Sequence, residues 1–340
     1  MRQKKEKIIL LGHGSGGKMM HDLIDTVFIK HFSNSILNEQ ADAAIIAAGS
    51  AQIAFTTDSF VIDPLFFPGG NIGKLAVCGT VNDLAVTGAE PRYLSVSFII
   101  EEGFPIDELE VIAGSLAAEA KRAGVYIVTG DTKVVNKGKC DKLFINTAGI
   151  GSISKENLHI SKAQDIVPGD VIIINGMIGD HGMAVMNARE SFNFRTTVES
   201  DCVSLNHLIS GVLSKSNVKF MRDPTRGGVA SVLNELSLKI GLGIDIEETA
   251  LPVRNSVRAM CELLGFDPLH VANEGKVLIV SAESSAAEIL DVLKDHDEGK
   301  DCAIIGRIVN DHPGRVVLRN QTGGSRIIDS LSGDQLPRIC

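Results

Sequence analysis

The sequence is poor in aromatic residues and lacks tryptophan: aromatic side chains make up 4% of the chain. Single-stranded nucleic acid is bound by stacking bases on such side chains, so it is not an expected partner. The formal net charge is −9, and basic residues cluster only within the first seven positions. This balance also disfavours duplex nucleic acid and anionic membrane surfaces as partners.

Long apolar runs are missing as well. The basic start MRQKKEK is followed by the apolar stretch Ile8–Leu11, which is too short for the hydrophobic region of a signal peptide. No run approaches the ~20 residues that a membrane span needs. The six cysteines are scattered without a CxxC pair, which argues against a zinc site or a disulfide framework. We therefore expect a protein of the reducing cytoplasm that does not enter a membrane.

What the sequence does contain is typical of a globular α/β protein. Hydrophobic residues make up 44% of its 340 positions, and 34 are glycine. This length suggests two domains, and the chain loosens around Ser161–Pro168. The expected parts are an N-terminal domain over 1–160, a second α/β domain over 161–324, and a mobile tail of low periodicity over 325–340.

Two aspartates in the stretch Thr56–Pro91 carry the first functional signal. Apolar residues ahead of Asp58 predict a short strand that ends at this carboxylate, and Asn71–Thr87 has the apolar spacing of a helix. Asp83 lies on a face of that helix with small neighbours, where a bulky anion could approach the backbone. Such a pair suits oxygen-only coordination of Mg²⁺ with phosphates as co-ligands. For an isolated pair, capping or solvated aspartates are the commoner explanation.

Other acids repeat this placement. Asp42 immediately precedes an apolar run, and a predicted buried strand over Gly124–Gly130 is followed by Asp131 and Lys133. Sheets of α/β proteins place their ligands at such strand ends. Asp131 is the third carboxylate at such a position, after Asp58 and Asp83. Three are harder to attribute to helix caps than two, so the pattern favours a site for a magnesium-bound nucleotide.

Glycine-rich and loop segments complete the set. LGHGSGGK at 11–18 precedes a predicted amphipathic helix over about 19–32, and such a loop can wrap an anion with its backbone N–H groups. It lacks the spacing of a Walker A loop, and alone it could equally be a flexible terminal loop. RDPTRGG at 222–228 leads into a helix with free N–H donors. HVANEGK at 270–276 leaves Glu274 at a junction of loop and strand.

Together these segments resemble the HypE family of hydrogenase maturation factors, also called carbamoyl dehydratases. The motifs are LGHGSGGK, TTDSFVIDPLFFPGGNIGKLAVCGTVNDLAVTGAEP, VTGDTKVV, GDHGMAVM, RDPTRGGVA, ANEGK and the terminal PRIC. The resemblance runs from about Ile8 to Cys340, and the motifs are specific in combination. It implies the two-domain α/β (α+β) fold of aminoimidazole ribonucleotide synthase and its relatives. It also implies a homodimer in which two N-terminal domains pair strands into a shared barrel, and a flexible C-terminal tail.

The resemblance further implies a reaction. A HypF-type carbamoyltransferase would place a carbamoyl group on the C-terminal cysteine, and ATP with Mg²⁺ would drive dehydration of that thiocarboxamide to a thiocyanate. The cyanide ligand would then pass through a HypC–HypD complex to the iron of a nickel–iron hydrogenase.

Matching the family motifs residue by residue assigns expected roles. Magnesium and phosphates would be held by Asp42, Asp58, Asp83 and Asp131, of which Asp58 and Asp83 are best supported. The loop that closes over the phosphates would contribute His13, Gly14, Gly16, Gly17 and Lys18. Cys340 would carry the substrate, while Lys133 and Glu274 would handle the protons of the amide nitrogen. Possible contacts from the second domain are His181 and Arg226.

Two other functions stay open on the sequence alone. A small-molecule synthase of the aminoimidazole ribonucleotide type would activate an amide oxygen in the same way, without a terminal cysteine. Selenophosphate synthesis is disfavoured because no cysteine occurs before Cys78, whereas that family usually has cysteine or selenocysteine beside its glycine-rich loop. A catalytically idle docking protein would have no need for Asp58, Asp83, Lys133 and Glu274.

Overall fold

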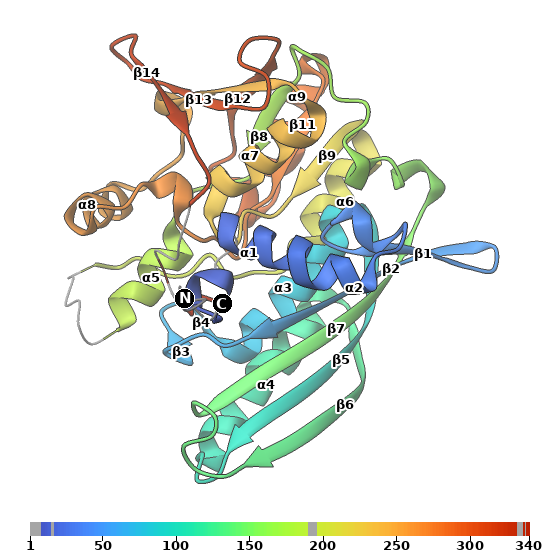
Figure 1. Cartoon of the computed structure of the whole chain (residues 1–340), viewed down its shortest axis with the longest axis vertical. Helices are drawn as coiled ribbons and strands as arrows, with labels where there is room; N and C mark the ends of the chain where they lie inside the picture. Colours follow the sequence, from blue (N-terminus) through green and yellow to red (C-terminus); the bar gives the residue numbers. More distant parts are fainter. Residues whose placement is uncertain (1–7, 15–16, 190–195, 332–335, 337) are drawn as a thin grey trace, which may run out of the picture.

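The computed structural model describes residues 8–14, 17–189, 196–331, 336 and 338–340. Two α/β parts lie one above the other in Figure 1, each built on its own sheet, and the C-terminal end of the chain lies near their junction. Within the described ranges, no helix combines the length and the apolar character that crossing a bilayer requires.

The first sheet has the strand order β1-β2-β7-β5-β6. Its strands are β1 (Ala44–Ala48), β2 (Ala51–Phe60), β5 (Ala89–Glu101), β6 (Tyr126–Val135) and β7 (Leu143–Ile153). β5 and β6 run parallel, and the other neighbours are antiparallel. Helices α3 (Ile72–Val86) and α4 (Ile106–Ala123) lie on one face of this sheet (Figure 1). The short hairpin of β3 (Phe66–Phe67) and β4 (Gly70–Asn71) leads into α3.

Helix α3 begins at a strong capping signal. The Oδ1 atom of Asn71 accepts hydrogen bonds from the backbone N–H groups of Gly73 at 2.9 Å and Lys74 at 3.2 Å, which satisfies two donors of the first turn. The predicted helix over Asn71–Thr87 is thereby confirmed to within one residue at each end. Nearly all of its residues are buried, so α3 is the central helix of this part.

The second sheet has the order β14-β13-β10-β12-β8-β11-β9. Its strands are β8 (Val171–Ile174), β9 (Val218–Arg222), β10 (Gly243–Glu247), β11 (Leu278–Ser281), β12 (Ala303–Val309), β13 (Val316–Arg319) and β14 (Ser325–Ile328). The accompanying helices are α5 (Asp180–Ala188), α6 (Asn206–Lys215), α7 (Gly228–Ile240), α8 (Asn255–Leu264) and α9 (Ala286–Lys294). In β8 the side chains alternate: Ile172 and Ile174 pack in the cluster with α7, and Ile173 packs with α6 and α9. The sheet is therefore covered on both faces.

The N-terminal helix expected over about 19–32 is present. It consists of α1 (Lys18–Leu23), a π-helical turn (Ile24–Ile29) and α2 (Lys30–Phe32). It lies across the junction of the two parts in Figure 1.

The strand expected to be buried over Gly124–Gly130 is instead an exposed edge strand, so that prediction was wrong. β6 runs through Asp131 and Lys133 to Val135, and nine of its ten residues are exposed. An edge strand has an unpaired side, and its apolar residues alone cannot reveal whether another element covers them. Asp131 and Lys133 consequently lie within the strand and not at its end.

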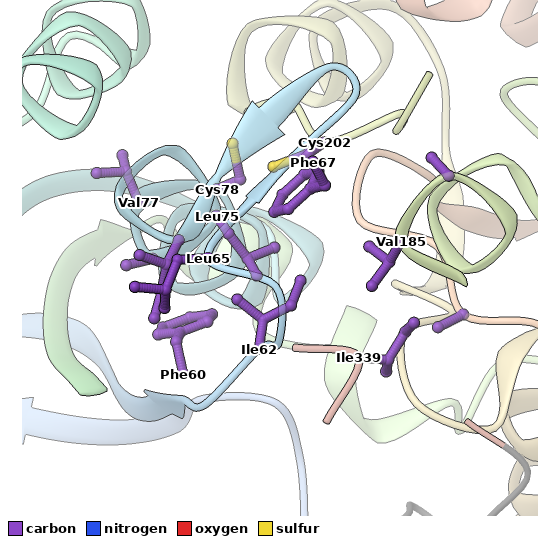
Figure 2. Close-up of a cluster of buried hydrophobic side chains, with 14 of the residues drawn as sticks. Phe60, Ile62, Leu65, Phe67, Leu75, Val77, Cys78, Val185, Cys202 and Ile339 are labelled. Carbon is purple, nitrogen blue, oxygen red and sulfur yellow. The ribbon is translucent and has the colours of Figure 1, made fainter. Parts of the chain in front are cut away.

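The expected mobile tail over 325–340 is also corrected for the residues that the structure describes. Ser325–Ile328 form β14, which pairs antiparallel with β13. At the end of the chain, Ile339 is 3% exposed and belongs to the same buried cluster as Val185 of α5 (Figure 2).

A candidate active site at the domain junction

A cavity of about 250 Å³ lies between β2, α3 and the segment that precedes α7. Its lining includes six carboxylates, from Asp42, Asp58, Asp83, Asp223, Glu235 and Glu274. Two arginines, Arg222 and Arg226, and the terminal residue Cys340 line it as well. Both domains and the end of the chain thus meet at one strongly acidic site.

Asp58 and Asp83, the best supported of the expected magnesium ligands, both line this cavity. Asp58 lies in β2, two residues before its end, and a Cβ atom on Gly79 would lie 3.5 Å from its Oδ2 atom and 2.9 Å from the ring of Phe60. Glycine at position 79 therefore lets the helix backbone approach the carboxylate. Asp83, one turn further along α3, accepts a hydrogen bond from Thr56 Oγ1 at 2.9 Å.

Burial and mutual repulsion raise the pKa of Asp83 and Asp223, two of the acids that line the cavity, whereas at Glu235 burial is outweighed by His21 and Arg222, which lower the pKa. Burial first, and then the charges of Asp223, Asp58 and Asp42, raise the pKa of Asp83 well above its usual range. The pKa of Asp223 rises to about 7, again through burial first and then through Asp42. The site therefore holds more negative charge than its own groups stabilise, and a bound cation would relieve it.

The two arginines offset part of this charge. Arg222 pairs with Asp42 at 2.9 Å and with Glu235 at 3.4 Å. Arg226 lies 4.0 Å from Asp58 Oδ1 and donates a hydrogen bond to the backbone oxygen of Gly14 at 3.0 Å. The negative charge of Cys340 is the largest influence that raises the pKa of Arg226, so this guanidinium stays charged beside the chain terminus.

The donor set fits a hard divalent cation. Its atoms are carboxylate oxygens, which Mg²⁺ prefers, and phosphate oxygens of a nucleotide could complete the shell. In the described ranges, no three histidine, cysteine, aspartate or glutamate side chains form a ready-made ion site. An ion would therefore bind only after small movements of Asp58, Asp83 and Asp223 toward it. Mg²⁺ usually binds in this way, together with the phosphates of a nucleotide.

Glu274 is buried at the inner end of the site. It is 3% exposed, and its Oε1 atom has no hydrogen-bond partner among the described residues. Burial, followed by the nearby Cys202 and Asp58, raises the pKa of Glu274 well above its usual range. A buried carboxyl that is unsatisfied on one oxygen and faces a cavity is available for proton transfer.

The end of the chain is docked against the loop after β2. Val61 N–H donates to the Cys340 backbone oxygen at 3.0 Å, and Asp63 N–H donates to the Arg338 oxygen at 3.2 Å. The Arg338 side chain donates back to the Val61 oxygen at 2.9 Å. Cys340 lines both the acidic cavity and a neighbouring cavity of about 70 Å³, which Arg226 also lines. The terminal residue thus lies beside the acids and is half-buried.

The glycine-rich loop lies near the site but only part of it reaches the cavities. Gly14 lines the smaller cavity, and the Lys18 N–H donates to the Leu331 oxygen at 3.1 Å. A Cβ atom on Gly17 would lie 2.3 Å from that same oxygen, so this contact requires glycine. The His13 ring bonds to the backbone of Leu10, and the Lys18 side chain is exposed. Gly16 lies outside the described residues.

Asp131 and Lys133 do not meet the other candidates within one chain. Asp58 lies opposite Thr147, which lies opposite Val96, and Val96 pairs with Gly130. Because side chains alternate along a strand, Asp131 points to the other face of the sheet from Asp58. Asp131 and Lys133 are 59% and 69% exposed and form an ion pair at 2.8 Å. The hydrogen bond from Lys133 is the main cause that lowers the pKa of Asp131.

Sequence reasoning missed several residues of the site. Asp223 belongs to RDPTRGG, in which an acid before a proline at a strand end is a usable signal for a site residue. Glu235 follows on α7 and Thr56 on β2, and nothing in their local pattern distinguishes them from ordinary polar residues. Only the fold brings these three side chains to the cavity.

Comparison with known proteins agrees with this geometry. Residues 40–153 match the N-terminal domain, and residues 167–319 the C-terminal domain, of AIR synthase related proteins. The chain is 47% identical over 339 residues to carbamoyl dehydratase HypE of Rhodobacter capsulatus, covering 99% of both chains. A HypE–HypF complex crystal structure contains a chain with 49% identity and a TM-score of 0.85, over 91% of this chain and 99% of that one.

A crystal structure of the hydrogenase maturation protein HypE in complex with ATP is 45% identical, with a TM-score of 0.81 over 98% of this chain and 100% of that chain. The two matched domains and the near full-length identity make the fold that of AIR synthase related proteins. The chain belongs to the HypE family of hydrogenase maturation factors, the carbamoyl dehydratases.

Proposed function

We propose that this protein uses ATP to dehydrate a carbamoyl group on the Sγ atom of its own Cys340 to a thiocyanate. The observation that carries the proposal is the position of Cys340, which lies between two cavities and beside Arg226. A chain end in that position places a tethered substrate next to the acids of the cavity. A small-molecule synthase would have no use for a cysteine there.

ATP is the proposed energy source, and a relative of this family was crystallised with it. Asp58, Asp83 and Asp223 would hold Mg²⁺ and, through it, the triphosphate. The cation would supply charge neutralisation, which a cavity lined by six carboxylates needs before it can accept another anion. The N–H groups at the start of α7, after Gly227, would offer further donors to phosphate oxygens.

The chemistry follows from the leaving group. An amide oxygen leaves poorly, so transfer of the γ-phosphoryl group to the thiocarboxamide oxygen gives ADP and an O-phosphorylated intermediate with a C=N bond, as the first N–H proton departs. Loss of phosphate then breaks the C–O bond as the remaining N–H proton departs and the C≡N bond forms. The net change is thiocarboxamide plus ATP to thiocyanate plus ADP, phosphate and a proton. Arg226 would stabilise the developing charge on oxygen, and Glu274 would accept a proton from nitrogen.

A second copy of the chain would supply Asp131 and Lys133. The open face of the first sheet carries an exposed apolar row of Phe55, Ile150, Tyr93 and Tyr126, which are neighbours across β2, β7, β5 and β6. Apolar rows beside an unpaired edge are interaction surfaces. We propose that two copies join these edges into a shared barrel, so that β6 of the partner brings its lysine to the site.

The remaining partners follow from the same reaction. A HypF-type carbamoyltransferase would load Cys340, as the HypE–HypF complex of a relative suggests, and a HypC–HypD complex would collect the cyanide group in the cytoplasm. Because β14 ends at Ile328, about twelve residues remain to carry the cysteine outward. Extended, they would reach on the order of 40 Å.

Intact-mass spectrometry tests the proposal directly. Incubation with a HypF-type enzyme and its substrates should add one carbamoyl group to the chain. Addition of Mg-ATP should then remove one water from the modified protein, and Cys340→Ser should show neither change. Modification at another residue, or loss of water without ATP, would refute the assignment.

A further inference from the structure

A buried histidine contacts the docked chain end. His181, in the first turn of α5, has no solvent exposure. Its Nε2 atom lies 2.8 Å from the backbone oxygen of Ile339, and its Nδ1 atom lies 2.8 Å from Ser200 Oγ. The ring of Phe67 meets the imidazole edge-on at 5.5 Å, which fixes its plane. The sequence indicated His181 only as a possible contact from the second domain, and the proposed reaction gives it no step.

The direction of these hydrogen bonds is determined by chemistry. A carbonyl oxygen only accepts, so His181 Nε2 carries the hydrogen that it donates to Ile339. In the neutral ring Nδ1 then accepts, and Ser200 Oγ–H is its donor. Ser200 Oγ in turn accepts from the Cys202 N–H at 3.0 Å. Burial lowers the pKa of His181, which favours the neutral ring that this chain of bonds requires.

The residue after Ser200 holds the catalytic candidate Glu274. Asp201 accepts hydrogen bonds from the backbone N–H groups of Glu274 at 3.1 Å and Gly275 at 3.3 Å, and it pairs with Lys276 at 2.9 Å. Two consecutive, half-buried residues therefore connect the two sites: Ser200 contacts the histidine that holds the tail, and Asp201 contacts the backbone that carries Glu274.

We propose that His181 is a positioning residue that latches the docked tail, and that Ser200–Asp201 sets the distance between this latch and Glu274. Docking does not depend on the reaction, whereas the role in catalysis rests on the proposed function. Without the latch, Cys340 visits the cavity less often, because one of the bonds that hold Ile339 is lost. The neighbouring contacts of Val61 and the burial of Ile339 remain, so docking weakens without being abolished.

Two amide substitutions distinguish the hydrogen bond at Nε2 of His181 from the one at Nδ1. In His181→Gln the side-chain nitrogen can occupy the position of Nε2 and still donate to Ile339. In His181→Asn the shorter amide can replace Nδ1 at Ser200 but does not reach the tail. A structural role for the histidine in α5 would be harmed by both changes, whereas a latch is lost only in the asparagine variant. His159→Asn is the matched control, since that ring bonds backbone oxygens of Glu156 and Val218.

Alkylation of Cys340 by iodoacetamide measures docking without any partner protein. Cleavage before Asp334 releases the peptide DQLPRIC for quantification, and Cys140 provides an internal standard in the same digest. Loss of one hydrogen bond should raise the alkylation rate of Cys340 by about tenfold in His181→Asn. The rate should stay within about twofold of wild type in His181→Gln and in the control. Equal rates in the two amide variants, or no rise in His181→Asn, would overturn the latch.

Single-turnover dehydration of the carbamoylated protein tests the catalytic part. His181→Asn should slow the loss of water while the Kd for Mg-ATP stays at the wild-type value, and His181→Gln should restore the rate. If alkylation responds as expected but no variant, wild type included, loses water, the latch stands and the proposed reaction fails. If wild type loses water at the same rate as His181→Asn, the latch has no role in the reaction.

Discussion

Glu274 shows how a single residue can reveal a site. An unsatisfied carboxyl oxygen costs free energy in a protein interior, and most buried polar atoms avoid it. Here the cost falls on the residue that faces the cavity from which a nitrogen proton would have to be removed. The surrounding fold keeps the carboxylate in place through Asp201, which accepts hydrogen bonds from the backbone and leaves the side chain available.

Replacing Glu274 with glutamine should block proton removal and leave the preceding steps intact. The amide has almost the same shape but cannot accept the proton, so dehydration should fall by about 100-fold or more. Carbamoylation of Cys340 and binding of Mg-ATP should be unchanged, as followed by intact-mass spectrometry and calorimetry. Glu262→Gln, on the exposed side of α8, is the matched control. A Glu274→Gln protein that loses water at the wild-type rate would exclude this residue as the base.

Asp201 should matter for stability more than any exposed acid. Its carboxylate is 5% exposed and pairs with Lys276, which is 8% exposed. Removing one partner of a buried pair leaves the other charge uncompensated, so Asp201→Asn should lower the free energy of unfolding by about 3–5 kcal/mol. Urea denaturation measures this change. Asp297→Asn, at an exposed pair with Lys300, should leave the unfolding free energy nearly unchanged.

The same residue gives a pH dependence with a definite sign. Burial alone would raise the pKa of Asp201, but the charge of Lys276 and the hydrogen bonds from Lys276 and the Glu274 N–H outweigh it and hold the pKa below its usual value. A depressed folded-state pKa means that the stabilisation is fully present above the unfolded pKa of about 3.9. It is lost as the pH falls through the lower folded value. Acid unfolding of Asp201→Asn should therefore depend less on pH in this range than that of wild type.

At the scale of elements, the sequence predicted where helices begin and end better than it predicted which strands are exposed. Helix α3 begins and ends within one residue of expectation, because Asn71 is a strong local signal for a helix start. β6 was expected to be buried because its apolar residues look the same whether a helix or a partner covers them. Asp58 and Asp83 could be grouped in advance because one motif holds both, and the structure places both at the same cavity; their role as magnesium ligands stays a prediction. The proximity of Asp223 to Asp83 could not be predicted, because the two residues are far apart in the sequence and only the folded chain brings them to one cavity.

Gly79 illustrates an element-level constraint that can be tested. Alanine normally stabilises a helix interior relative to glycine by about 1 kcal/mol. In α3, however, the added Cβ atom would lie 2.9 Å from the buried ring of Phe60 and beside Asp58. Gly79→Ala should therefore destabilise the protein by about 1–3 kcal/mol and weaken Mg-ATP binding.

Gly114 in α4 is the control for this change, because a Cβ atom there meets nothing within 4 Å. Gly114→Ala should stabilise the protein by about 1 kcal/mol without affecting nucleotide binding. Thermal denaturation and calorimetry distinguish the two variants. If Gly79→Ala instead stabilises the protein and leaves nucleotide affinity normal, the close approach of α3 to Asp58 is not required for binding.

For the molecule as a whole, the open question is how two faces of one sheet contribute to one reaction. Asp58, Glu274 and Cys340 gather on the helix-covered side, whereas Lys133 extends from the opposite face at an unpaired edge. Side-chain rotation cannot bring Lys133 through the sheet. If both groups act in one site, they come from different copies of the chain.

Mixed dimers test this arrangement. Asp58→Asn and Lys133→Ala should each be inactive as pure homodimers. When the two variants are co-expressed with different tags, half of the dimers are mixed, and each mixed dimer contains one site with neither change. About a quarter of the wild-type dehydration activity should return. Tandem-affinity purification isolates the mixed dimer, whose activity should be about half that of wild type.

The control pairs two changes that lie in one cavity, Asp58→Asn and Glu274→Gln. Each site in that mixed dimer carries one defect, because both residues come from the same chain. No activity should return, although the dimer forms equally well. Recovery in this control would mean that the cavity itself is shared between copies. Absence of recovery with Lys133→Ala, in a dimer shown to be mixed, would mean that the lysine acts within its own chain or not at all.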